Sequence, residues 1–181
     1  YAGYKKELIG EGFATDLGIL QYYYPTSGTP WNQISPNAAN PNSTELYIAQ
    51  NFSFGALTGF AKFSYAVSTL FGVANSSGSY YPDLTLNYDT GVWGLALNGH
   101  IGYQYVSNTQ TLNGIAYNFS YTDWKLGVTK DFGGGLSGNI SYVGTTSPKA
   151  NGNYLWYVPT SNGTNKSAGQ GGGLISLTKT F

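Results

Sequence analysis

His100 is the only histidine in the chain, so its neighbours decide what chemistry it could perform. With Asp123 and a serine such as Ser64 or Ser141 it could form a hydrolase-like set, because such catalysis needs a nucleophile, a base and an orienting carboxylate within hydrogen-bond distance. The chain contains no G-x-S-x-G elbow that would present a nucleophilic serine. We therefore expect that the protein is not an enzyme and has no catalytic residue.

Metal, cofactor and nucleic-acid chemistry find little support in the sequence. The chain has no Cys, and a single His without ligand-spaced partners does not form a convincing metal site. The glycine runs 133–135 and 171–173 do not stand between a strand and a helix, as a phosphate-binding loop does. The 8 basic and 8 acidic residues give a formal net charge of zero, without the basic surplus of a nucleic-acid binder. We expect no metal, no cofactor and no nucleic-acid partner.

His100 also belongs to a set of ionisable residues that fall within strand-like segments. The members near mid-segment are Lys62, Asp83, His100, Asp123 and Lys125, and those nearer the segment ends are Asp16 and Glu45. Neighbouring strands lie about 4.8 Å apart, so Lys62 could reach Asp83, and His100 could reach Asp83 or Asp123. Two interpretations stay open: a charge belt that sets the ion selectivity of a pore, or structural pairing that neutralises charge inside a narrow barrel. The near balance of signs does not by itself predict a strong anion or cation preference.

The segment 92–106 indicates what kind of element carries these residues. Its odd positions, from Trp93 to Tyr105, are mostly apolar, and its even positions are small or polar and include His100. A period of two is that of a β-strand. The apolar face has aromatic residues at both ends and aliphatic residues between them, as in a strand that crosses a bilayer. This pattern predicts a membrane-crossing strand with His100 on its polar face.

Nine segments of this kind follow one another along the chain. They are 1–6, 13–24, 45–52, 56–68, 79–88, 92–106, 119–130, 136–146 and 172–181. Short connections (7–12, 53–55, 89–91 and 131–135) alternate with long ones (25–44, 69–78, 107–118 and 147–171). Outer-membrane barrels have tight periplasmic turns and longer external loops. The predicted fold class is all-β, a transmembrane antiparallel up-and-down β-barrel that forms one domain over residues 1–181.

Strand number and direction follow from this interpretation. Single-chain bacterial barrels have even strand numbers, and the chain begins without Met inside an apparent strand. We therefore expect a signal peptide and at least one strand upstream, and ten to twelve strands in the complete protein. The last segment ends in Phe181 and runs toward the short turns, which places the C-terminus on the periplasmic side of a bacterial outer membrane.

Composition fits a protein surrounded by lipid. Only 9% of residues are charged, against about 25% in ordinary soluble domains. No run approaches the roughly 20 apolar residues of a transmembrane helix. The expected partners are outer-membrane lipid and lipopolysaccharide, and the expected membrane-interface aromatic residues are Trp93, Tyr103, Tyr105, Trp124 and Phe181. A soluble barrel or sandwich is a third interpretation, which would turn the apolar faces inward.

Several stretches, spread over nearly the whole chain, carry a family resemblance. They are Tyr1–Lys5, Gly18–Pro25, Phe63–Ser68, Asn98–Gln104, Tyr121–Asp131 and Ser176–Phe181. In them the chain resembles the TorF porin family, a group of proteobacterial proteins catalogued as conserved and hypothetical, and the Tyr-Thr-Asp-Trp-Lys stretch is the most specific. The resemblance implies an outer-membrane barrel and a pore, with no established substrate or catalytic residue. The family's additional N-terminal strands, with an Arg-Gly-Ile-Ser-like motif, are absent from this sequence.

Two functions are therefore expected from the sequence. The first is a passive, porin-like channel for small solutes. The alternative is a non-conducting barrel that serves as an anchor or as a surface-binding or assembly module through its long loops, which contain Trp31, Tyr154, Trp156 and Tyr157. Inward aromatic residues such as Phe60, Tyr81 and Tyr121 could plug a barrel of ten to twelve strands. Homo-oligomers and partner subunits stay open in both cases.

Overall fold

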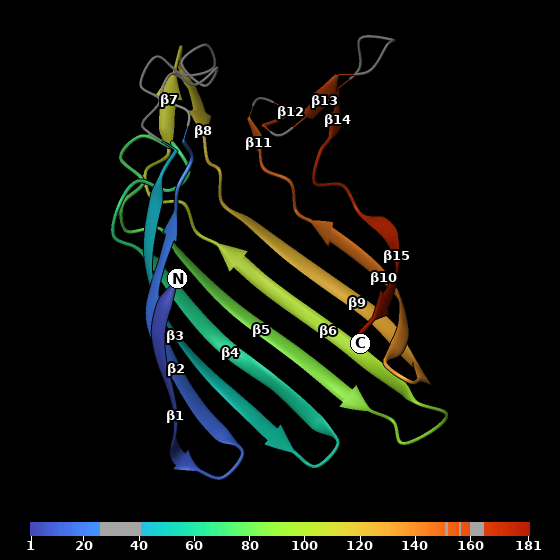
Figure 1. Cartoon of the computed structure of the whole chain (residues 1–181). Helices are drawn as coiled ribbons and strands as arrows, with labels where there is room; N and C mark the ends of the chain where they lie inside the picture. The colour runs from blue at the N-terminus through green and yellow to red at the C-terminus, as the bar shows by residue number, and fades with distance from the viewer. Residues whose placement is uncertain (26–40, 151, 156, 160–164) are drawn as a thin grey trace.

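The computed structural model describes residues 1–25, 41–150, 152–155, 157–159 and 165–181. Its main element is one antiparallel sheet of nine strands in the order β1-β2-β3-β4-β5-β6-β9-β10-β15 (Figure 1). The strands are β1 (Ala2–Gly10), β2 (Phe13–Tyr22), β3 (Ser43–Phe54), β4 (Leu57–Ala66), β5 (Tyr80–Asp89), β6 (Leu95–Gln104), β9 (Tyr121–Gly133), β10 (Leu136–Thr145) and β15 (Gly172–Lys179). The prediction of an all-β chain with nine main strands, each paired with the next, is confirmed.

Three two-stranded ribbons extend the long connections at one end of the sheet (Figure 1). They are formed by β7 (Gln110–Leu112) with β8 (Ile115–Tyr117), β11 (Lys149–Ala150) with β12 (Asn153–Tyr154), and β13 (Tyr157–Pro159) with β14 (Asn165–Ser167). The opposite end carries the short turns, at 11–12, 55–56, 90–94 and 134–135. We call these the long-connection end and the short-turn end. Among the described residues, no helix is long and apolar enough to cross a membrane.

The turn between β5 and β6 differs from the sequence prediction. The strand expected to begin at Val92 begins at Leu95, and Trp93 and Gly94 have φ angles of 52° and 65°. A positive φ cannot continue a strand, and for a bulky residue such as Trp93 it is an uncommon turn conformation. The Leu95 N–H donates to the Val92 carbonyl at 3.0 Å, which closes the turn. Trp93 therefore lies in the turn rather than in the strand.

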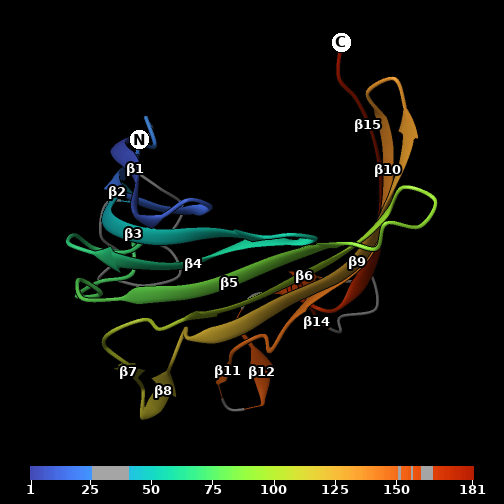
Figure 2. The ribbon, with the colours of Figure 1, turned by 90° about the horizontal axis from the view of Figure 1, so that it is seen from below.

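The sheet is strongly curved but not closed. β1 and β15 form its two edges and are not paired with each other, and the curvature brings both edges to the same side of the sheet (Figure 2). Because every pairing is antiparallel, β1 and β15 run in the same direction. The predicted closed barrel is therefore not seen in the described residues, and the coarser prediction of an antiparallel all-β sheet is the one that holds.

The two faces of the sheet differ sharply in chemistry. The convex outer face exposes large apolar side chains, among them Ile48, Leu97, Ile101, Leu126 and Ile175. The inner face is polar and concave: side chains from β5 and β15, four positions apart in the sheet, line one hollow. Few hydrophobic residues of the described chain are buried, so the sheet keeps most of its apolar surface on the outside.

Candidate functional site

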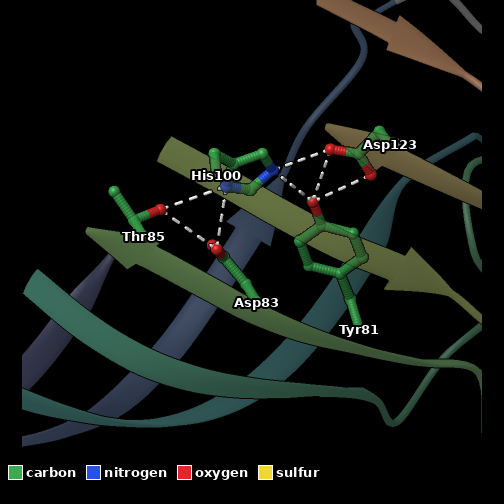
Figure 3. Close-up of polar contacts among 5 residues, drawn as sticks. All are labelled: Tyr81, Asp83, Thr85, His100 and Asp123. Atoms are coloured by element: carbon green, nitrogen blue, oxygen red, sulfur yellow. Dashed lines mark hydrogen bonds and ion pairs between the residues drawn. The ribbon is translucent and has the colours of Figure 1, made fainter. Parts of the chain in front are cut away.

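His100 lies on the inner face of β6 between two carboxylates from different strands (Figure 3). Its Nδ1 is 3.1 Å from Oδ1 of Asp83 on β5, and its Nε2 is 2.7 Å from Oδ1 of Asp123 on β9. The register explains this arrangement, because Gly102 of β6 stands between Asp83 and Asp123 and His100 is its next neighbour on the same face. The ring thus bridges three adjacent strands.

Two hydroxyl groups complete what we call the His100 cluster (Tyr81, Asp83, Thr85, His100 and Asp123). The Tyr81 hydroxyl donates to the Asp123 carboxylate, with O···O distances of 3.0 and 3.1 Å, and lies 3.3 Å from His100 Nε2. The Thr85 hydroxyl donates to Asp83 at 3.2 Å and lies 3.0 Å from His100 Nδ1. All five side chains are therefore tied into one hydrogen-bonded network (Figure 3).

Gly102 makes room for this network. Tyr81 stands on β5 but reaches Asp123 on β9, so its ring must cross the intervening strand. A Cβ atom at Gly102 would lie 2.1 Å from the Tyr81 hydroxyl oxygen and 2.4 Å from the ring carbon that bears it. Such distances are well inside van der Waals contact, so only glycine permits the crossing at this position.

The polar groups of the cluster satisfy one another and do not form a catalytic set. Neither Ser64 nor Ser141 hydrogen-bonds to His100, whose partners are carboxylates, a phenol and a threonine hydroxyl. The imidazole stands between the two carboxylates. The three groups therefore face one another and do not point together toward a shared substrate or metal position. In the part of the chain that the structure describes, no set of three His, Cys, Asp or Glu side chains could hold a metal ion.

The two lysines of the predicted belt are placed differently from the acids. In register, Lys62 pairs with Asp83 and Lys125 with His100, so both lie on the inner face beside the cluster. Neither ammonium group forms a close ion pair within the described ranges. The expected contact between Lys62 and Asp83 is replaced by those of Asp83 with His100 and Thr85.

Asp16 and Glu45 lie on the inner face away from the His100 cluster. Asp16 accepts a hydrogen bond of 3.0 Å from the Tyr47 hydroxyl. Tyr47 repeats the arrangement of Tyr81, because its ring lies over Gly18, and its hydroxyl oxygen would be 2.7 Å from a Cβ at Gly3. Glu45 is only 8% exposed and sits near the long-connection end of β3.

The connection 67–79 covers this end of the inner face. Ala66, the register partner of Glu45, packs with Leu70 and Val106 in a small buried core. The connection is held by fully buried serines: the Leu70 N–H donates to Ser76 Oγ at 2.7 Å, and Ser79 Oγ donates to the Ser76 carbonyl at 2.6 Å. This segment is a packed part of the fold and lies over the inner face.

Toward the short-turn end, the inner face carries an asparagine network. The Asn98 amide donates to Asn87 at 2.8 Å and accepts from Thr129 at 2.6 Å and from Asn139 at 3.1 Å. It borders a hollow of about 290 Å³. The hollow is lined by Thr85, Asn87, Asn98, Gly99, His100, Lys125, Thr129, Ser137, Asn139, Ser176 and Thr178. His100 and Thr85 therefore separate this hollow from the carboxylates of the cluster.

Comparison with known proteins places the chain in a family. The sequence model of a family described as "Bacterial protein of unknown function (Gcw_chp)" matches residues 1–181. The chain belongs to this family. No curated protein and no solved structure matches the chain. The relatives of the chain are therefore bacterial proteins, and the family description assigns no activity to the inner face.

In this Gcw_chp member, the predicted interface aromatic residues lie toward the two ends of the sheet. Trp93 is 81% exposed in the turn before β6, and Phe181 follows β15 at the same short-turn end. Tyr103 and Trp124 are exposed on the outer face toward the long-connection end. Tyr105 follows β6 there and stacks on Tyr80, with ring centroids 4.7 Å apart.

Some predicted loop residues fall outside the described structure. Trp31 and Trp156 lie outside the described residues. Tyr154, in β12, has the Lys149 ammonium 4.4 Å from its ring centroid, a cation–π contact that occupies one face of the ring.

Sequence reasoning missed the asparagine network and the serine-held connection 67–79. The signal for the network was available, because Asn87, Asn98 and Asn139 all occupy inner positions of their strands. Asn98 faces Asn87 in register, and Asn139 reaches it across Gly127. No sequence period marks the connection 67–79, whose structure depends on contacts with the ends of β4 and β6.

Proposed function

We propose that the chain forms the wall of a bacterial outer-membrane β-barrel that acts as a passive, porin-like channel for small solutes. The observation that carries the proposal is the division of the sheet into an apolar outer face and a polar inner face. Leu126, for example, is 68% exposed on the outer face. Apolar surface in water costs about 25 cal/mol per Å², so a lipid environment accounts for this face.

The aromatic residues support the same proposal. Trp93 and Phe181 mark the short-turn end of the outer face, and Tyr103, Tyr105 and Trp124 mark the other end. Rings of this kind favour the two interfaces of a bilayer. In the proposed orientation the short turns and the C-terminus lie on the periplasmic side, and outer-membrane lipid and lipopolysaccharide are the surrounding partners.

A closed barrel requires partners for the free edges of β1 and β15. These edges run in the same direction, so an odd number of additional antiparallel strands would join them. One or three such strands give a total of ten or twelve, an even number as in bacterial barrels. We propose closure of this kind. The additional strands would come from this protein or from a partner subunit.

The resemblance to the TorF porin family supports the pore, because it implies a barrel of the same kind. In the proposed channel, Lys62, Asp83, His100, Asp123 and Lys125 would line the narrow level of the lumen. Rings of charged side chains of this type govern ion selectivity in known channels.

Planar-bilayer conductance tests the proposal directly. The full-length protein should give discrete current steps, and Lys62→Ala and Asp83→Ala should shift the reversal potential in opposite directions, because they remove charges of opposite sign. A complete lack of current steps would remove the pore from consideration. If the folded protein stays soluble without detergent, the membrane assignment fails as well.

A second function, a non-conducting anchor or binding module, is favoured by one specific observation. The connection 67–79 packs over the inner face through Leu70 and Val106 and is tied to Ser107, whose N–H donates to Ser79 at 3.0 Å. If this segment blocks the lumen, the barrel would not conduct, and deletion of 69–78 should open it. Conductance by the intact protein would rule out this alternative.

A further inference from the structure

The hollow on the inner face is lined almost entirely by hydrogen-bond donors. Its side chains supply one ammonium group, one imidazole, several hydroxyls and several amides, and none of its lining residues is acidic. A site with this composition is suited to a ligand rich in acceptors. Small anions with several oxygen atoms meet that description.

Several of these donors have no partner among the residues that the structure describes. Lys125 Nζ and the hydroxyls of Ser137, Ser176 and Thr178 make no hydrogen bond or ion pair with any residue in the described ranges. Polar groups at the wall of a partly enclosed space are normally satisfied by protein, water or ligand. Four such donors around one hollow therefore mark it as a place where an acceptor can bind.

The nearest carboxylates are held away from the hollow. Asp83 and Asp123 are bonded to His100, Thr85 and Tyr81 and are not among the lining residues. Strands β10 and β15 add no acidic side chain, because their inner positions carry Ser137, Asn139, Ser176 and Thr178. Among the described residues, Lys125 is therefore the only lysine at the hollow wall, and an anion would meet no carboxylate among the lining side chains.

The asparagine network gives the wall a fixed shape. Asn98 bonds to Asn87, Thr129 and Asn139, so these amides are oriented by one another and not by solvent. Lys125 and the β15 hydroxyls of Ser176 and Thr178 line the same hollow as these amides. A pre-formed wall lowers the entropic cost of binding a small ligand.

We propose that this hollow is a binding site for a small oxyanion, a phosphate or a carboxylate, with Lys125 as its charged anchor. The inference names the solute class of the inner face and so rests on the proposed channel for its biological meaning. Binding itself requires only the folded sheet. Ser137, Ser176 and Thr178 would donate to the remaining oxygens of the anion.

Isothermal titration calorimetry of the full-length protein in neutral detergent micelles tests the site, with sodium phosphate and sodium acetate titrated in separate runs. Lys125→Gln should weaken binding of the preferred anion by about tenfold or more, because it removes the charge of a charge-assisted contact. Lys125→Arg should retain most of the affinity. Lys6→Gln, which removes an equal charge from the outer face of β1, should leave it within about twofold.

The two titrations distinguish the sources of the oxyanion. Tighter binding of phosphate assigns the site to a phosphate group, and tighter binding of acetate assigns it to a carboxylate. If the wild-type protein binds neither, or if Lys6→Gln and Lys125→Gln weaken binding equally, the site does not exist as proposed. Ser176→Ala with Thr178→Ala should give a smaller loss than Lys125→Gln, since these residues supply neutral donors.

Bilayer recordings separate failure of this site from failure of the channel. A conducting protein whose Lys125→Gln variant keeps the same anion preference, and which binds no phosphate or acetate, overturns the site and leaves the channel intact. A protein that binds the anion through Lys125 but gives no current keeps the site and overturns the channel.

Discussion

The His100 cluster and the hollow beside it share strands β5, β6 and β9 but satisfy their polar groups in opposite ways. In the cluster, both ring nitrogens of His100 and both neighbouring carboxylates find partners within the chain. In the hollow, Lys125 and the hydroxyls of β10 and β15 find none in the described residues. The cluster is thus a structural tie between three strands, whereas the hollow leaves its donors available to a ligand.

The difference follows from what stands on the neighbouring strands. Gly102 has a carboxylate on each side, at Asp83 and Asp123, and the space above it admits the Tyr81 ring. Lys125, in contrast, faces Val143 on β10, which in turn faces Gly172 on β15. Neither residue offers an acceptor side chain, so the lysine has no partner in the direction of the free edge.

The largest expected effect comes from His100→Ala. The substitution leaves Asp83 and Asp123 without their shared partner, so we expect a loss of about 2 kcal/mol in the free energy of unfolding, below the cost for a fully buried pair because these side chains keep some contact with water. Urea-induced unfolding of the protein in detergent micelles measures the loss.

Lys62→Ala is the matched control for this experiment. Lys62 lies on the same face beside Asp83 but makes no ion pair in the described part of the chain, so its removal should cost less than about 0.5 kcal/mol. Equal losses for the two variants would mean that the His100 cluster does not tie the strands together.

The two regions also differ in how far the sequence predicted them. A period of two placed His100, Asp83 and Asp123 on one face, and the count of strands made them neighbours, so their contact was predictable. The sequence did not distinguish which basic side chain would contact Asp83, because Lys62 and His100 are both adjacent to it in the sheet. Side-chain length and the direction of each rotamer decide that choice.

The hollow and the open edges were less predictable for a physical reason. A hollow depends on curvature, which brings Ser176 of β15 toward Thr85 of β5, and curvature is not encoded in the alternation of any one strand. Trp93 illustrates a related limit. Its apolar side chain fits the outer pattern, yet Gly91 and Gly94 favour a turn with positive φ angles, and the turn overrides the pattern.

A second prediction breaks the cluster without removing a charge. Gly102→Ala would place a Cβ atom 2.1 Å from the Tyr81 hydroxyl oxygen, so the rigid ring must turn away and lose its two contacts with Asp123. We expect a loss of about 1.5 kcal/mol in the free energy of unfolding, less than for His100→Ala because the histidine keeps its carboxylates.

Gly99→Ala provides the control on the same strand, since nothing lies within 4 Å of an added Cβ there. Its effect should stay below about 0.5 kcal/mol. In a Tyr81→Phe background, Gly102→Ala should still clash with the ring but should lose no hydrogen bond, so its cost should fall. An unchanged cost in that background would show that the Tyr81 hydroxyl contributes nothing.

A third prediction concerns the wall of the hollow. Asn98→Ala removes three hydrogen bonds that hold the asparagine network, and we expect a loss of about 1 kcal/mol, limited by the access of water to this face. Asn87→Ala, which removes only the bond to Asn98, should cost about half as much. If both variants unfold with the same midpoint as the wild-type protein, the network does not stabilise the wall.

The smallest effect is expected at Ser141, on the inner face of β10 beside Gly127. This side chain is only 4% exposed, and its hydroxyl has no hydrogen-bond partner among the described residues. Removing an unsatisfied buried hydroxyl releases its desolvation cost, so Ser141→Ala should leave the free energy of unfolding within about 0.5 kcal/mol or raise it. Ser76→Ala is the matched control, because the Ser76 hydroxyl accepts from Leu70 and donates to Val73, and its loss should cost about 1 kcal/mol. If Ser141→Ala were as damaging as Ser76→Ala, Ser141 would have to bond to a group such as an ordered water. Its hydroxyl would then have a hydrogen-bond partner, like the polar groups of the His100 cluster and unlike the donors of the hollow.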